Sequence, residues 1–204
     1  MPLYRRVLAV GSELERIGVL VEQGDAEKLK EALSREIVSP ELPEIGRETL
    51  AEALGIMEKL MEILDGRSNS VYEYGEAVMA YLGNGEEALN RYLEAETRFE
   101  ANFPQWETFF EHILVNHMFF SVFPFQDRPE DMRSEVTALC VIYALMRFLA
   151  IGYTAEHGGN DAFIDVMAAA FRLVDHTDFD RYSVVLLKRL GCNSPEKLCG
   201  LVQL

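Results

Sequence analysis

The sequence predicts an all-α protein, folded as a single compact bundle of about nine or ten helices in one domain. Three observations support this fold class. Apolar side chains recur every three or four residues along most of the chain, as in helices that bury one face. The sustained alternation of apolar and polar residues that marks half-buried strands is nearly absent. Helix caps, prolines and glycines punctuate the chain at short intervals.

Helix signals divide the N-terminal part of the chain into four segments. Apolar residues follow helical spacing over residues 4–21, and the glycine and aspartate at 24–25 begin a second, short helix. Residues 39–46 contain two prolines and a glycine and therefore predict a loop. Apolar stripes then predict helices over residues 47–64 and 70–82.

The C-terminal part, residues 84–204, holds most of the aromatic residues and is expected to form the core, with residues 1–83 as peripheral helices. Pro104 suits the start of a helix over residues 105–123, and Pro129 with the two acids after it opens a long helix to about residue 156. The remaining helices are expected over residues 86–102, 160–174 and 178–190 and from Ser194 onward, with Asn160, Thr177 or Asp178, and Ser194 as caps.

Residues 136–153, VTALCVIYALMRFLAIGY, form an apolar run with about the length of a membrane span. Arg147 lies inside the run and no basic cluster flanks it, so we expect a helix at the centre of the bundle and no membrane segment. We expect Arg147 to pair with a carboxylate inside the bundle, although its planar guanidinium could instead hold the carboxylate or phosphate of a ligand. The acidic candidates are Glu111, Glu135 and Asp165.

The charge balance and the cysteines exclude several classes of function. Nineteen basic residues against thirty-four acidic ones give a net charge of -15, which repels nucleic acids and anionic membranes. The three cysteines show neither a CxxC pair nor zinc-like spacing, so we expect no metal site and a cytoplasmic protein with reduced thiols. No glycine-rich nucleotide loop, GxSxG or HExxH motif is present, and no complete catalytic set can be identified.

The helix expected over residues 105–123 carries several polar side chains of interest. Phe109, Ile113, Asn116, Phe120 and Phe123 fall on one side of it, so we expect Asn116 to be buried and bonded to the backbone near Pro124, with a ligand contact as the alternative. His112 and His117 are five residues apart and point about 140° from each other, so they are expected to be surface or core histidines and not joint metal ligands. Glu107 and Glu111 share a face and are expected to be solvated.

The segment FEHILVNHMFFSVFPF, residues 110–125, resembles a hallmark of the flagellin lysine-N-methylase family. In that family a Glu-Asn pair is followed by an asparagine, two aromatic residues and an FPF triplet, and here His112 stands in place of the Asn after Glu111. The similarity continues in the long apolar helix, in the pair Asp175-His176 and in the LLK triplet at 186–188. It covers residues 90–190, with a weaker similarity in the earlier helices.

The resemblance implies a part in protein lysine methylation. Family members transfer methyl groups from S-adenosylmethionine to lysines of flagellin, so it implies this cofactor and flagellin or another protein as substrate. It also implies that Glu111, Asn116, Phe123, Pro124 and Phe125 contribute to substrate recognition or to a wall of the methyl-transfer site.

The cysteine content separates this chain from a complete enzyme of that family. In the family, cysteines clustered in the N-terminal part are associated with an iron–sulfur centre, and three scattered cysteines cannot supply four thiolate ligands. We therefore expect no iron–sulfur cluster within this chain and no activity from the chain alone. The alternatives are a helical module that binds a small molecule and a structural interaction domain.

Overall fold

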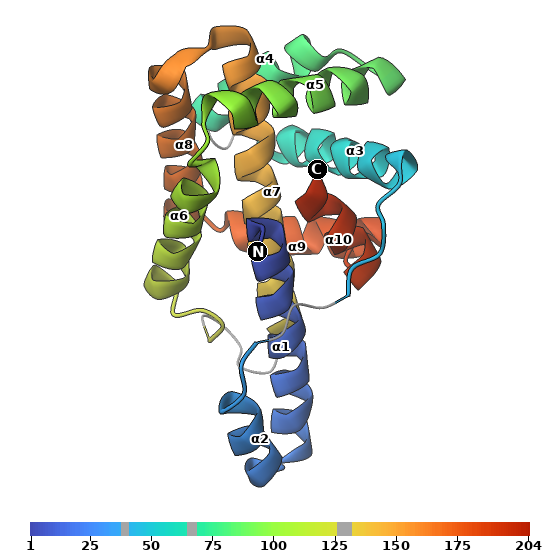
Figure 1. Ribbon diagram of the computed structural model, residues 1–204, viewed down its shortest axis with the longest axis vertical. Helices are drawn as coiled ribbons and strands as arrows, with labels where there is room; N and C mark the ends of the chain where they lie inside the picture. Colours follow the sequence, from blue (N-terminus) through green and yellow to red (C-terminus); the bar gives the residue numbers. More distant parts are fainter. Residues whose placement is uncertain (38–40, 65–68, 126–131) are drawn as a thin grey trace.

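The computed structural model describes residues 1–37, 41–64, 69–125 and 132–204. Over these residues the chain forms ten α-helices and no strand, which confirms the all-α prediction (Figure 1). The helices are α1 (Leu3–Gln23), α2 (Ala26–Leu33), α3 (Arg47–Leu64), α4 (Asn69–Leu82), α5 (Glu86–Asn102), α6 (Trp106–Phe120), α7 (Met132–His157), α8 (Gly159–His176), α9 (Phe179–Leu190) and α10 (Pro195–Gln203).

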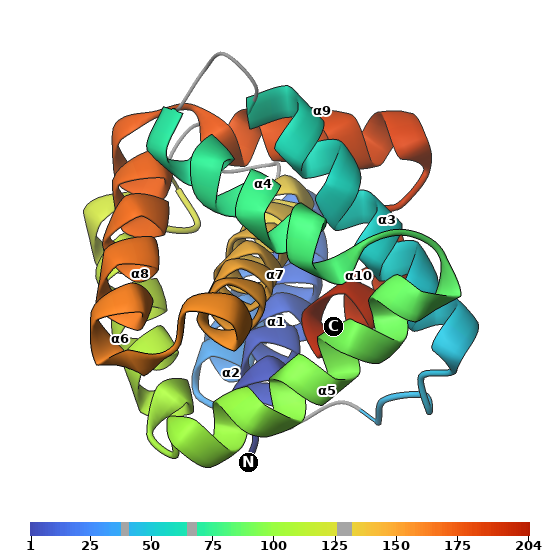
Figure 2. The same ribbon diagram turned by 90° about the horizontal axis from the view of Figure 1, so that it is seen from above.

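The helix α7 is the axis of the bundle, and the view along it shows the other helices arranged around it (Figure 2). This helix is long and apolar enough to cross a membrane, but 94% of its most apolar stretch is buried inside the protein. The predicted central helix is therefore confirmed. Such complete burial explains why the helix is apolar on all sides, because every face of it packs against a neighbour.

One hydrophobic core contains side chains from every described helix except α2. Within residues 1–83, Met57 of α3 and Val71 and Val78 of α4 are completely buried in this core. Close packing at one contact requires a glycine, because a Cβ atom on Gly152 of α7 would lie 2.3 Å from the Cγ1 atom of Val78. The division of the chain near residues 83–85 into peripheral and core parts stays a prediction.

The helix bounds agree with the predicted ones to within about three residues, but the end of α6 and the cap of α8 differ from the prediction in detail. The helix α6 ends at Phe120 and not at Phe123, because a tight turn follows it. The helix α8 begins at Gly159 and is not capped by Asn160. The predicted cap at Ser194 is confirmed, since its side chain accepts a hydrogen bond from the amide of Lys197.

Two predicted features lie outside the described residues. They are the first two residues of the loop predicted over residues 39–46 and the start of α7 at Pro129 with Glu130 and Asp131.

The helix α2 and the second half of α1 project from the bundle at its lower end (Figure 1). The fully buried residues of α1 all lie in its first half, between Leu3 and Gly11. The only buried residue of α2 is Ala32, which does not belong to the common core. This tip is therefore held mainly by contacts between α1 and α2 themselves.

Candidate functional site

A polar region of the interior surrounds Arg147, near the middle of α7. The side chain of Arg147 is only 5% exposed, and its Nη2 atom donates a hydrogen bond to the Glu96 carboxylate of α5. Its Nη1 atom lies 3.9 Å from a carboxylate oxygen of Glu100, one turn further along α5. The guanidinium also lies over the ring of Trp106, 4.7 Å from its centroid, in a cation–π contact. We call these four residues the Arg147 cluster.

The predicted pairing of Arg147 with a carboxylate is confirmed, but all three acids proposed for it were wrong. Glu111 of α6 instead forms an ion pair with Arg6 of α1, at the surface. The true partner, Glu96, carried a signal in the sequence, because it is the one acid within the apolar stripe of α5. An acid in such a stripe has to face the core, where it requires a cation.

Two buried tyrosines extend the polar character of this region. Tyr92 and Tyr143 are fully buried, and neither hydroxyl makes a hydrogen bond of normal geometry with the described residues. Burial raises the pKa of Tyr143 to about 12 and raises the pKa of Tyr92 further, so both are neutral. Burial also raises the pKa of the Glu96 carboxyl, although Arg147 opposes part of that shift.

A cavity of about 280 Å³ opens over the Arg147 cluster, between α1, α5, α6 and the C-terminal end of α10. Besides the cluster it is lined by Tyr4, by Glu107 and by Gln203. Glu107 accepts a hydrogen bond of 2.9 Å from the amide of Leu3, which fixes the start of α1 against α6. The cavity thus contains three carboxylates and one guanidinium, with aromatic rings on its walls.

The helix α6 has two apolar faces, and the buried one is not the predicted one. Its fully buried residues are Trp106, Phe110, Leu114 and His117. The stripe that was expected to face the core contains Asn116, which is exposed, and Phe109 and Phe120, which are 53% and 79% exposed. The prediction of a buried Asn116 that bonds the backbone near Pro124 is therefore wrong.

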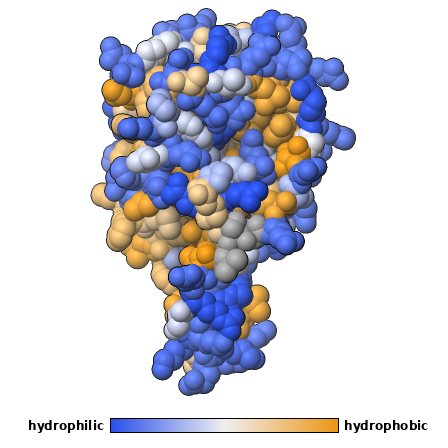
Figure 3. Space-filling model, in the orientation of Figure 1, coloured by the Kyte–Doolittle hydropathy of each residue, from blue (hydrophilic) through white to orange (hydrophobic). Residues whose placement is uncertain are grey.

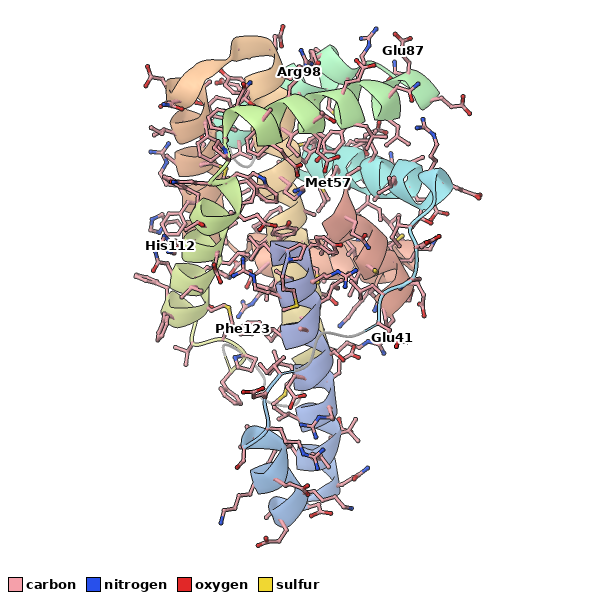
Figure 4. The ribbon with its side chains drawn as sticks, viewed as in Figure 1. Glu41, Met57, Glu87, Arg98, His112 and Phe123 are labelled. Carbon is pink, nitrogen blue, oxygen red and sulfur yellow. The ribbon has the colours of Figure 1, made fainter. Side chains whose placement is uncertain are left out.

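His117 is a core residue with a partner, as one of the two expected roles for it required. Its Nδ1 atom lies 2.9 Å from a carboxylate oxygen of Asp175, and both side chains are less than 10% exposed. This pair ties α6 to the end of α8. His112 is exposed and projects outward from α6 (Figure 4). The family-like residues near 117 and 175, distant in sequence, are thus brought into contact.

The turn after α6 contains the other three motif residues and an unusual backbone conformation. Val122 has a φ of 56°, in the left-handed region that a β-branched residue seldom adopts. The amide of Phe123 donates to the carbonyl of Met118 and the amide of Val122 donates to that of Phe119, as in a Schellman helix end. Phe123 and Pro124 are partly buried, whereas Phe125 is 56% exposed.

A second cavity, of about 420 Å³, lies between α1, residues 41–43, α7 and α10. Its floor includes Cys140 and Cys199, and burial raises the pKa of the Cys140 thiol to about 12. Glu15, Glu41 and Glu196 stand around it, and no lysine or arginine is found among the described residues of its lining.

Neither cavity fits S-adenosylmethionine well. The carboxylate of its methionyl part requires a cation or a set of free amide donors. Arg147 in the smaller cavity is already engaged by Glu96 and Glu100, and the larger cavity is lined by carboxylates. We therefore assign no cofactor-binding residue at either of these two cavities.

Comparison with known proteins gives one match. The sequence profile described as the FliB lysine N-methylase C-terminal domain matches residues 1–201. No protein with a curated function and no solved structure shows significant similarity to the chain. The profile match extends the resemblance noted for residues 90–190 to the first helices.

Proposed function

Because this chain belongs to the family of the FliB lysine N-methylase C-terminal domain, we propose that it receives the substrate lysine for protein lysine methylation. The site of reception is the cavity over the Arg147 cluster. The observation that carries the proposal is its surplus of negative charge, since three carboxylates face a single guanidinium.

The cavity complements both parts of a lysine side chain. Glu100 is half exposed and Glu107 is partly buried, so both can face an ammonium group that enters from solvent. Tyr4 and Trp106 supply apolar and aromatic walls for the methylene stem. A lysine that enters the cavity therefore replaces part of its hydration by charge and ring contacts.

Glu96 adds a chemical property to this recognition. A lysine accepts a methyl group only as the neutral amine, so its ammonium must first lose a proton. A carboxyl group whose pKa is raised by burial accepts that proton more readily than an ordinary glutamate does. We assign Glu96 this role of holding the proton while Arg147 keeps the carboxylate in place.

The proposal can be tested with a small probe of the lysine side chain. Trp106 is the single tryptophan of the chain, so its fluorescence reports on the cavity alone. We expect a saturable change on titration with Nα-acetyl-lysine methylamide and none with the norleucine analogue, which has the stem but no ammonium. Glu100→Gln should weaken binding by about fivefold, as expected for a partly exposed charge contact of about 1 kcal/mol.

The matched control is Glu94→Gln, which removes a carboxylate on the exposed side of the same helix and should leave binding unchanged. Equal binding of the lysine and norleucine probes would contradict the proposal.

A second experiment concerns methyl transfer itself. We expect the purified 204-residue chain to add no methyl groups to flagellin in the presence of S-adenosylmethionine, because its three scattered cysteines cannot supply an iron–sulfur centre and its sequence has no glycine-rich nucleotide loop. Mass spectrometry of lysine peptides measures the outcome. Clear methylation by the chain alone would place the donor site within these helices and contradict the expectation that the methyl donor binds elsewhere.

A further inference from the structure

The exposed side of α6 and of the turn after it is strongly apolar. Phe119 is 82% exposed and Phe120 is 79% exposed, values that are rare for phenylalanine in a folded protein. We define the α6 outer face by its exposed apolar residues: Phe109, Val115, Phe119, Phe120, Val122 and Phe125. Figure 3 shows this apolar surface on the left of the molecule, over α6.

The α6 outer face contains no carboxylate, although the chain has thirty-four of them. The two acids of α6 are turned toward α1 and engaged there, Glu107 by the amide of Leu3 and Glu111 by Arg6. The polar residues exposed between the phenylalanines are His112 and Asn116. The face is therefore an uncharged apolar strip on a protein whose net charge is -15.

Backbone strain coincides with this strip. Val122 keeps its left-handed conformation at the point where the chain leaves α6 and presents Phe125. A glycine would adopt this conformation without strain. Strained residues of this kind occur more often at binding sites than elsewhere, because the strain persists where it aims neighbouring groups.

We propose that the α6 outer face binds an amphipathic helix of the substrate protein, apolar along one side and rich in lysine along its flanks. From Phe109 to Phe120 the strip is about 16 Å long, which corresponds to three turns of a docked helix. The net charge of -15 favours a basic partner and disfavours a second copy of this chain, which would carry the same charge. The inference rests on the proposed function, because the docked helix would belong to the same substrate protein whose lysine the Arg147 cavity receives.

A designed peptide tests this docking directly. The probe is a fluorescein-labelled helical peptide of about 18 residues, with leucines at helical spacing on one side and lysines elsewhere. Its fluorescence anisotropy should rise on binding to the full 204-residue chain. The Phe119→Ser/Phe120→Ser variant should bind at least about tenfold more weakly, because central aromatic side chains dominate helix-in-groove binding.

Three controls make the result specific. Leu33→Ser removes an apolar side chain that is 66% exposed on α2 and should change binding less than twofold. A peptide with the same leucine stripe but glutamate in place of lysine should bind far more weakly, as should a scrambled peptide that has no stripe. Equal binding of the scrambled peptide, or unchanged binding by the double serine variant, would overturn the proposal.

The other possible occupants give different results. Loss of a dimer in the double serine variant by analytical ultracentrifugation would identify a second copy as the occupant, and binding to phosphatidylcholine vesicles would identify a lipid surface. Either outcome overturns the proposal. The Glu100→Gln variant should still bind the peptide, and the double serine variant should still bind the lysine amide. The failure of this inference and the failure of the proposed function can therefore be distinguished.

Discussion

The Arg147 cluster buries a charged side chain, and the α6 outer face exposes apolar ones. Both arrangements run against the usual burial preference of the side chains concerned. In the cluster a guanidinium that is 5% exposed lies inside an apolar bundle, and its charge is matched there by Glu96. On the outer face, phenylalanines about 80% exposed stand in water with nothing in the described chain to cover them. A buried charge requires partners inside the protein, whereas an exposed apolar strip contributes little to the fold and favours a partner outside it.

The largest loss of stability is expected when the buried pair of Arg147 and Glu96 is broken. Arg147→Met should lower the free energy of unfolding by roughly 3 to 5 kcal/mol, because Glu96 is left buried and uncompensated. Chemical denaturation measures the loss. The second substitution Glu96→Leu, added to Arg147→Met, should restore much of it, since no unpaired charge then remains. An Arg147→Met protein of unchanged stability would show that the cluster does not hold the fold.

The same variant should show a defined pH dependence. Without Arg147, burial and the neighbouring Glu100 carboxylate both keep the pKa of Glu96 in the folded protein above the ordinary value of 4.5. Below that ordinary value the carboxyl group is protonated in both states, and the penalty disappears. The penalty grows as the pH rises toward the pKa of Glu96 in the folded protein. The stability deficit of Arg147→Met should therefore be larger at pH 7 than at pH 4, and an equal deficit at both would contradict the assignment of Glu96 as the partner.

The second test replaces His117, the residue of α6 that contacts Asp175 of α8. His117→Leu should destabilise the protein by about 1 to 3 kcal/mol, because the Asp175 carboxylate then lies buried without its hydrogen bond. Thermal or urea unfolding measures the effect. His112→Leu is the matched control on the exposed side of the same helix and should stay within about 0.5 kcal/mol of the parent. Equal effects of the two substitutions would refute the assignment of faces on α6.

The third test relieves strain at the edge of the outer face. Val122→Gly should stabilise the protein by about 1 kcal/mol, since glycine adopts a positive φ without the clash that a β-branched side chain incurs. Urea denaturation measures the gain. If the strain serves binding, the same variant should bind the lysine-rich peptide less well although it is more stable. A loss of stability would show that φ at residue 122 is not positive.

The smallest effect is expected from Asn116, and it reverses the sequence-based expectation. Asn116→Leu should change the free energy of unfolding by less than about 0.5 kcal/mol, because the amide is exposed on the outer face. Differential scanning calorimetry checks this. A clear fall in melting temperature would restore the prediction of a buried, hydrogen-bonded amide.

The helices could be predicted from the sequence because each has its own apolar period and its own stop signals. The outer face could not, since α6 is apolar on both sides and its periodicity does not reveal which side meets the core. The periodicity therefore predicts Asn116 in the core. Which side of α6 faces the core depends on the contact of His117 with Asp175, 58 residues further along the chain. Likewise the pairing of Arg147 follows from burial alone, but the identity of its partner depends on how α5 crosses α7.

The projecting tip formed by α2 and the second half of α1 has a consequence for how the molecule opens. Its residues add little to the common core and contact α7 near its start, at Met132 and Arg133, so they can separate while most of the side chains around α7 stay covered. Their backbone amides will exchange with solvent deuterium through local opening, whereas those of α7 will exchange only when the whole bundle unfolds. We therefore expect two cooperative units, of which a single melting temperature would report only the larger.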